Sequence, residues 1–202
     1  MDIRPLSIEG AYVASPRQFP DERGVFLESF RGDQLAEQLG HRPDIVQTNV
    51  SVSSRGTVRG IHFADVPPGQ GKYVTVLAGS LVDYVVDIRV GSPTFGRWES
   101  VTLDAVDRRA VYLAEGLGHA FCALEDHTTA MYLCTATYNP SAEHGIHPLD
   151  SEVGLVLPAG IDPLLSPKDD AAPSLADAVA SGRLPTYAGC RAWADELSQR
   201  AS

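Results

Sequence analysis

The chain has 202 residues, enough for one domain with a sizeable hydrophobic core. Its net charge of −10 argues against a nucleic-acid-binding surface, because such a surface needs a basic patch. The three cysteines include no CxxC pair, which argues against a disulfide framework and a thiolate zinc site, and no apolar stretch is long enough to span a membrane.

Short runs with strand character, separated by turn residues, make up most of the chain. We predict strands at 46–52, 58–63, 73–77, 81–88, 99–103, 110–113, 120–124 and 130–138. Turn signals such as Ser54-Arg55-Gly56 and Gly91-Ser92-Pro93 fall between them. Many short strands at this spacing indicate a sandwich or barrel, and the absence of βαβ alternation argues against a parallel sheet. The fold class is therefore predicted to be dominated by β-structure.

Helix signals are few and lie toward the two ends of the chain. We predict a short helix at 33–39 that Gly40 ends, a helix through residue 180 that Ser174 caps, and a last helix at 191–199 outside the sheets. Four prolines between residues 158 and 173 indicate an extended, irregular stretch. We predict a single domain over 1–202, with a β core at about 20–157 and a Pro-rich, helical segment at about 158–202.

Polar and apolar residues alternate along the strand predicted at 46–52. One face carries Gln47, Asn49, Ser51 and Ser53, and the other carries Thr48, Val50 and Val52. If the aliphatic face packs on a sheet or core, the opposite face is a row of uncharged hydrogen-bonding groups. The following strands bring a few cationic or titratable side chains, namely Arg59, His62 and Lys72. This pattern predicts a pocket for a polar, anionic, oxygen-rich ligand.

The chain's cationic groups are mostly arginines. Only Lys72 and Lys168 are lysines, so these two positions favour a compact ammonium on a flexible stem. An anionic ligand of an acidic protein needs basic side chains gathered at one place, and the candidates are Arg23, Arg59, Lys72 and Lys168. Two of the cysteines, Cys122 and Cys134, lie in apolar runs and are expected to be small core residues.

Three interpretations compete for His62 and His119, which each follow a glycine at a predicted strand edge. A metal site fits poorly, because a catalytic metal commonly uses three protein ligands and only two imidazoles are available. Two satisfied core histidines are the second interpretation. The third is acid–base chemistry, with His62 as a neutral base near physiological pH.

The acid–base interpretation needs two further groups. A carboxylate on the other ring nitrogen would fix the tautomer of His62, and Asp83 and Asp169 are both candidates. Tyr132 is the candidate for the opposing acid, although a core tyrosine with its hydroxyl at the mouth of a barrel would leave the same pattern.

Several ordered blocks of the sequence resemble one enzyme family. The first blocks are Asp21-Glu22-Arg23-Gly24-x-Phe26-x-Glu28, Gln47-x-Asn49-x-Ser51-x-Ser53, Arg59-Gly60-Ile61-His62 and Gly71-Lys72-Tyr73. They continue with Asp87-Ile88-Arg89-x-Gly91-Ser92-Pro93-Thr94-Phe95-Gly96, Gly116-x-Gly118-His119-x-Phe121, Tyr132 with Tyr138, and Ser166-Pro167-Lys168-Asp169. Together they resemble the dTDP-4-dehydrorhamnose 3,5-epimerase family, including its members in antibiotic deoxysugar pathways.

The resemblance implies a cupin-type jelly roll with a few short peripheral helices, acting as a homodimer without metal or organic cofactor. The implied substrate is a dTDP-4-keto-6-deoxyhexose. By match of motif, His62 is the base, Tyr132 the acid, Asp169 the partner of His62, and Lys72 the cation at the C4 oxygen. Substrate contacts are implied for Arg23, Glu28, Gln47, Asn49, Arg59, His119, Tyr138, Glu143 and Lys168. We expect a cytoplasmic protein with neither nucleic-acid nor membrane partners.

The chain departs from the family pattern at two places near the implied sugar site. Ala64-Asp65-Val66 stands where many members carry a glutamine, and Gly118-His119-Ala120-Phe121 replaces the common Ala-His-Gly-Phe. These differences leave open whether C3, C5 or both centres are inverted, and whether the pathway leads to dTDP-L-rhamnose or to an antibiotic sugar. The alternatives are a single-centre epimerase, a non-catalytic sugar-nucleotide-binding cupin and a metal-dependent cupin enzyme.

Overall fold

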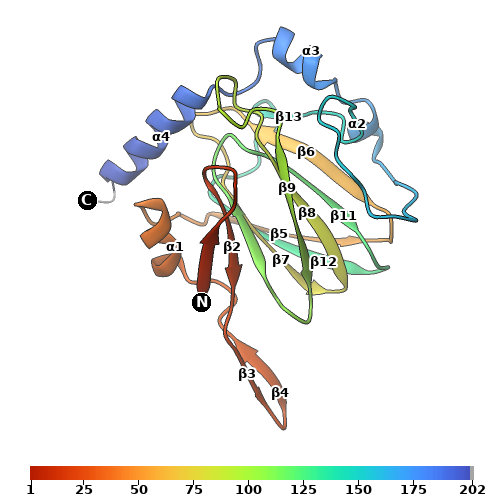
Figure 1. Ribbon diagram of the computed structural model, residues 1–202. Coiled ribbons are helices and arrows are strands. Elements are labelled where there is room, and N and C mark those ends of the chain that lie inside the picture. Colours follow the sequence, from red (N-terminus) through yellow and green to blue (C-terminus); the bar gives the residue numbers. More distant parts are fainter. Residues whose placement is uncertain (201–202) are drawn as a thin grey trace.

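The computed structural model describes residues 1–200, and its fold is built on two antiparallel sheets (Figure 1). The six-stranded sheet has the strand order β1-β2-β10-β7-β12-β5. Its strands are β1 (Asp2–Pro5), β2 (Ala11–Ser15), β5 (Gln47–Ser53), β7 (Lys72–Ala78), β10 (Ala110–Leu113) and β12 (Thr128–Cys134). The five-stranded sheet has the order β13-β6-β11-β8-β9. Its strands are β6 (Val58–Ala64), β8 (Ser80–Val86), β9 (Trp98–Asp104), β11 (Gly118–Ala123) and β13 (Glu143–Gly145).

The main hydrophobic core lies between the two sheets. Val74 and Val111 of the six-stranded sheet belong to the same buried cluster as Leu81, Leu103 and Phe121 of the five-stranded sheet. Alternating side chains of both sheets therefore meet in the middle, as in a β-sandwich. This arrangement confirms the predicted fold class.

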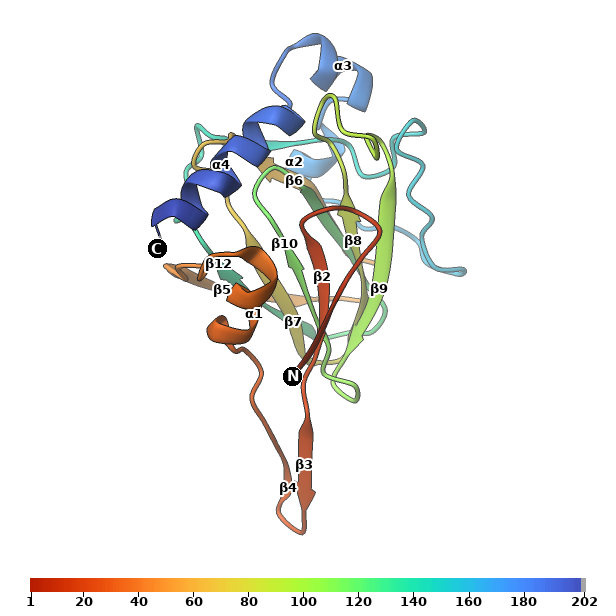
Figure 2. The same ribbon diagram turned by 60° about the vertical axis from the view of Figure 1, so that its left-hand side comes forward.

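A two-stranded hairpin projects from this body (Figures 1 and 2). It consists of β3 (Gln18–Asp21) and β4 (Gly24–Leu27), and it pairs with neither large sheet. Three of its apolar side chains, Phe19, Val25 and Phe26, are exposed, Phe26 by 68%. An isolated hairpin is only marginally stable in water, so this one is expected to gain stability from another surface.

Four helices lie outside the sheets: α1 (Gly32–Leu39), α2 (Pro167–Asp170), α3 (Leu175–Ala180) and α4 (Tyr187–Arg200). Gly40 ends α1 in the left-handed region with φ 76°, and the Ser174 side chain caps α3 by accepting the Asp177 N–H at 3.0 Å. Both predicted signals are confirmed. Among residues 1–200, no helix is long and apolar enough to cross a membrane.

The sequence-based element list differs from the structure at both ends of the β core. The core was predicted to start at about residue 20, but β1 and β2 pair with each other and with β10 from residue 2 onward. β1 is short, contains Pro5 and has largely exposed side chains, so it shows no apolar alternation. The strand predicted at 130–138 ends at Cys134, and α2 interrupts the stretch that was predicted to be irregular.

The structure shows which face of β5 is buried. Its aliphatic face does not pack on a core, because Val50 and Val52 are each 59% exposed. The polar face points inward instead, and Ser53 is buried. The core side of β5 is therefore the polar side, and its apolar side lies on the outer surface of the six-stranded sheet.

Candidate active site

A cavity of about 160 Å³ lies between the two sheets and gathers most of the predicted site residues. Its lining consists of Gln47, Asn49, Arg59, His62, Gln70, Lys72, His119, Phe121, Tyr132, Cys134, Tyr138 and Glu143. Lys72 and Tyr132 come from β7 and β12 of the six-stranded sheet, whereas His62 and His119 come from β6 and β11 of the other sheet. His62 and Tyr132 therefore stand on opposite walls of one cavity.

A bulge in β6 allows both Arg59 and His62 to face this cavity. Residues three apart on a regular strand point to opposite faces. In β6, however, Arg59 and His62 pair with Phe121 and His119, which are only two residues apart on β11. The extra residue on β6 restores a common direction. Gly60 makes the close approach possible: its φ is +114°, and a Cβ there would lie 2.3 Å from the carbonyl oxygen of His119.

Asp169 is the carboxylate that orients His62. The Nε2 of His62 lies 2.6 Å from Oδ1 of Asp169, whose side chain is almost fully buried. Burial alone would raise the pKa of Asp169, but the hydrogen bonds and charge of its neighbours, with His62 foremost, hold that pKa below its ordinary value. An ionised Asp169 accepts the Nε2–H of His62 and so leaves the lone pair on Nδ1.

Asp83, the other candidate, is paired with His119 instead. The Nε2 of His119 lies 2.7 Å from Oδ2 of Asp83, and both side chains are buried. Each of the two histidines that line the cavity thus has a carboxylate partner behind it, and the two histidines are cross-strand neighbours on β6 and β11. His119, buried and hydrogen-bonded to Asp83, has the surroundings of a satisfied core histidine, whereas the side chain of His62 is 32% exposed.

Tyr132 faces the two histidines from the opposite sheet. Its hydroxyl lies 2.9 Å from Oγ of Ser51, and its ring meets the ring of His119 edge to face at 6.1 Å. Burial raises the pKa of Tyr132 to about 12, against a smaller lowering by the hydrogen bond with Ser51. The phenol therefore carries its proton over the whole physiological range of pH.

Lys72 is the first residue of β7, and its side chain faces the cavity. Burial lowers the pKa of Lys72. The acidic groups of Cys134, Glu143 and Asp83 act to raise this pKa, but their effect is smaller than that of burial. Cys122 and Cys134 are both buried, as expected for core cysteines, but Cys134 is also part of the cavity wall.

The dTDP-4-dehydrorhamnose 3,5-epimerase family model matches residues 5–177 of the chain. The chain belongs to this family. It is 56% identical to a dTDP-4-dehydrorhamnose 3-epimerase of Streptomyces niveus over 95% of this chain and 92% of the relative. It is 52% identical to a dTDP-4-dehydrorhamnose 3,5-epimerase of Mycolicibacterium smegmatis over 98% of this chain and 97% of the relative.

A solved structure of an epimerase from Streptomyces bikiniensis has the same fold. That protein is ChmJ, a 3'-monoepimerase in complex with dTDP-quinovose, and the comparison gives a TM-score of 0.94 at 47% identity over 96% of this chain and 98% of ChmJ. The fold of this family member is accordingly the cupin fold of its relatives, with two packed antiparallel sheets and few helices.

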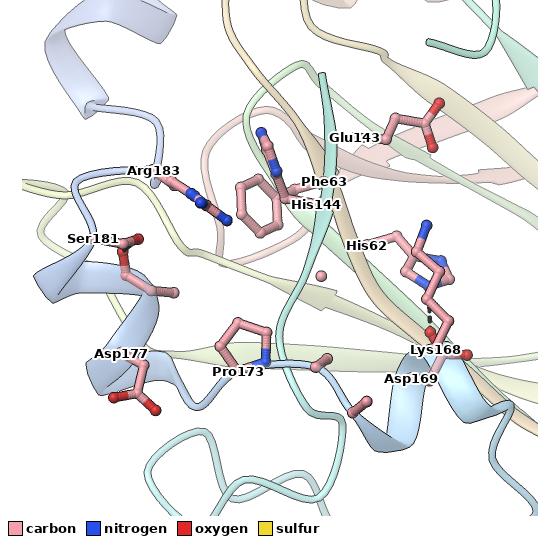
Figure 3. Close-up of a pocket in the computed structure, with 14 residues that line it drawn as sticks. His62, Phe63, Glu143, His144, Lys168, Asp169, Pro173, Asp177, Ser181 and Arg183 are labelled. Atoms are coloured by element: carbon pink, nitrogen blue, oxygen red, sulfur yellow. Dashed lines mark hydrogen bonds and ion pairs between the residues drawn. The ribbon is translucent and has the colours of Figure 1, made fainter. Parts of the chain in front are cut away.

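A second, larger cavity of about 450 Å³ adjoins the first in this epimerase-family chain (Figure 3). The two cavities share His62 and Glu143. Asp169 and Lys168 line the second cavity from α2, and Arg183 and His144 line it farther from His62. The Ser166 side chain caps α2 by accepting the Asp169 N–H at 3.1 Å, which holds Asp169 toward His62.

Two residues predicted to contact the substrate, Arg23 and Glu28, line neither of these two cavities. Arg23 lies at the tip of the β3–β4 hairpin, is largely exposed, and is paired with Asp21. Glu28 follows β4 and is paired with Arg31. Among residues 1–200, no cluster of three or more His, Cys, Asp or Glu side chains has the arrangement of a metal site.

Sequence reasoning did not assign roles to Ser51, Gln70 and Phe121, which contact or line the site. Ser51 belongs to the alternating polar row, and that row points into the molecule, so the signal for Ser51 was present. Phe121 belongs to the family motif that contains His119, and Gln70 lies in the loop before β7 with no sequence signal of its own.

Proposed function

We infer that the protein is a carbohydrate epimerase that inverts C3, or C3 and C5, of a dTDP-4-keto-6-deoxyhexose in rhamnose or antibiotic deoxysugar biosynthesis. The observation that carries this inference is the arrangement of the cavity. An imidazole and a phenol face each other from opposite sheets, and an ammonium lies on the phenol's side of the same space. Inversion beside a ketone requires a base and an acid on opposite faces of the sugar ring.

His62 acts as the base in this proposal. The C4 ketone acidifies the C–H bonds at C3 and C5, and Nδ1 of His62 removes one of these protons. Asp169 holds the imidazole in the required tautomer through the 2.6 Å hydrogen bond and stabilises the imidazolium that forms. The electron pair of the broken C–H bond passes into the ring and gives an enolate with its charge on the C4 oxygen.

Lys72 and Tyr132 complete the inversion. The ammonium of Lys72 stabilises the oxyanion at C4, where the negative charge develops. Tyr132 then donates its proton to the carbon from the opposite face, which a phenol with a pKa of about 12 is able to do because it is fully protonated beforehand. The proton lost to His62 and the proton gained from Tyr132 balance.

The remaining cavity residues suit a sugar nucleotide. Arg59 in this cavity and Lys168 in the adjoining one offer positive charge to a diphosphate, and Gln47, Asn49, His119 and Glu143 offer hydrogen bonds to the ligand. Tyr138 is 55% exposed at the rim, where its ring is available to stack on the thymine. This gathering explains how a chain with a net charge of −10 binds an anion.

A homodimer accounts for the two residues that this chain leaves outside. The hairpin that carries Arg23 projects away from the body with its apolar side chains exposed, and Val50 and Val52 form an apolar strip on the outer face of β5. We propose that a second copy covers both surfaces and that Arg23 and Glu28 serve the site of the partner subunit.

Proton NMR of the product in deuterated water tests the function. The substrate is dTDP-4-keto-6-deoxyglucose, and each inverted carbon exchanges its hydrogen for deuterium. We expect deuterium at C3 in every case, and the integral at C5 distinguishes a double from a single epimerase. Binding of the nucleotide sugar without any exchange would show a non-catalytic sugar-nucleotide-binding module instead.

A further inference from the structure

The ammonium of Lys72 has no side-chain partner that fixes its place. It makes no hydrogen bond or ion pair with any of residues 1–200, and the charges that influence it act from a distance. A flexible four-carbon stem without a partner samples several rotamers. The region that the ammonium can reach is therefore set by where the backbone at Gly71-Lys72 lies, at the start of β7.

Thr135 holds that backbone with two hydrogen bonds. The Thr135 N–H donates to the carbonyl oxygen of Gly71 at 3.0 Å, and the Gly71 N–H donates to Oγ1 of Thr135 at 2.8 Å. Thr135 follows Cys134, whose ladder position pairs it with Lys72 itself. The side chain of Thr135 thus extends the β7–β12 ladder by one further contact at the residue that precedes Lys72.

Glu115 completes the connection from a third segment of the chain. Its Oε1 accepts the hydroxyl of Thr135 at 2.7 Å, and Glu115 is only 9% exposed. The Glu115 side chain packs against two glycines: a Cβ at Gly71 would lie 2.9 Å from Oε1, and a Cβ at Gly69 would lie 2.6 Å from Cβ of Glu115. Glu115 therefore occupies the space that a side chain at Gly69 or Gly71 would need, and it packs against the loop at both of these residues.

We propose that Glu115 and Thr135 are positioning residues, which set the place of the Lys72 ammonium without touching the substrate. Neither residue lines the cavity that contains His62, and both face a separate cavity of about 530 Å³ on the other side of the Gly69–Gly71 loop. The proposal rests on the proposed role of Lys72 at the C4 oxygen.

Replacement of Thr135 by valine tests the proposal, because valine keeps the shape of the side chain. It removes the two hydrogen bonds of the hydroxyl, with the Gly71 N–H and with Glu115, and keeps the backbone hydrogen bond to Gly71. A misplaced catalytic group commonly costs up to about 100-fold in rate. We expect Thr135→Val to lower kcat about 10- to 100-fold with KM changed less than about threefold. Thr135→Ser restores the hydroxyl and should return kcat to near the wild-type value. Glu115→Gln keeps the acceptor and should be mild, whereas Glu115→Met should resemble Thr135→Val.

Thr75→Val is the matched control. Thr75 is on the same strand as Lys72, is 2% exposed, does not line the cavity, and donates its hydroxyl to the carbonyl oxygen of Arg109 at 3.1 Å. It removes one buried threonine hydrogen bond and should leave kcat unchanged even if it lowers the melting temperature. An equal loss of kcat in Thr75→Val and Thr135→Val would show a general effect of stability and overturn the proposal.

The lysine count provides a second readout that does not depend on turnover. Protein labelled with ¹³C at the lysine Cε gives only two side-chain signals, from Lys72 and Lys168, and Lys168→Arg assigns them. In folded Thr135→Val we expect the Lys72 signal to shift and its pKa to move toward the ordinary lysine value, while the Lys168 signal stays. An unchanged Lys72 titration, with unchanged kcat, would overturn the positioning role.

Lys72→Met separates this proposal from the function on which it rests. If Lys72→Met keeps full turnover, the role of Lys72 in the reaction fails, and the NMR titration still decides whether Thr135 positions it. If Lys72→Met is inactive while Thr135→Val is like wild type in both readouts, the proposed function stands and only the positioning role fails.

Discussion

His62 and Asp169 lie 107 positions apart in the chain, yet Nε2 of one is 2.6 Å from Oδ1 of the other. The strand β6 supplies the imidazole and the short helix α2 supplies the carboxylate, so the pair joins the Pro-rich C-terminal segment to the β core. The same hydrogen bond thus contributes both to the fold and to the proposed proton transfer, and these two effects are separable by experiment.

The division of labour between His62 and Tyr132 predicts different defects for their variants. His62→Ala removes the base and should abolish deuterium incorporation from solvent at the inverted carbon. Tyr132→Phe keeps the base but loses the opposing acid, so inversion should fall more than exchange, with inversion reduced about 100-fold or more. Proton NMR in deuterated water follows both quantities in one sample. Full turnover by His62→Ala would remove His62 from the mechanism.

The stability of the protein should depend on Asp169 in a defined pH range. The folded-state pKa of Asp169 is held below the ordinary aspartate value of about 3.9. A lowered carboxylate pKa stabilises the folded state above about pH 4, and this contribution disappears as the pH falls through the folded-state pKa. Urea unfolding of the wild type and Asp169→Asn should therefore differ most at pH 6 and least near pH 3. A difference that does not change with pH would contradict the pairing.

The basic limb of the rate profile should belong to Lys72 and not to Tyr132. Burial raises the pKa of Tyr132 to about 12 and lowers that of Lys72, so on raising the pH the ammonium loses its proton first. We expect kcat to fall as Lys72 is deprotonated, and Lys72→Arg should move any remaining basic limb to higher pH because a guanidinium stays charged. In an ultraviolet titration, the difference between wild type and Tyr132→Phe should be a phenol that ionises near pH 12. Ionisation of this phenol near pH 10 would contradict the assignment.

The sequence predicts most strands of this fold because each is a short run with strand character that is followed by turn residues. The predicted strands also contain several of the site residues, among them His62 and Tyr132. The ordered motifs identify the family that the comparisons establish. Which face of a strand is buried is harder to predict. The alternation in β5 separates the side chains into two sets, but the set that is buried depends on which sheet or partner covers each face, and the apolar set with Val50 and Val52 is the exposed one.

Two features of the site have no local sequence signal. Arg59 and His62 are three residues apart, so a regular strand would separate them, and only the bulge opposite His119 and Phe121 brings them to one face. The choice between Asp83 and Asp169 is likewise decided by tertiary structure. No local pattern distinguishes the two aspartates. Asp169 is the partner of His62 because α2 packs against β6.

The proposed exchange of Arg23 between subunits predicts complementation. Arg23→Ala should lose about 10- to 100-fold in kcat/KM, the range for a hydrogen bond to a charged group, and His62→Ala should be inactive. In a heterodimer of the two variants, the subunit that carries Arg23→Ala still has His62, and it receives an intact Arg23 from its partner. One of the two sites is therefore restored. Differently tagged subunits allow this heterodimer to be purified and assayed at low substrate concentration. If Arg23 served its own subunit, both sites of the heterodimer would be damaged and its activity would not exceed half that of the Arg23→Ala dimer.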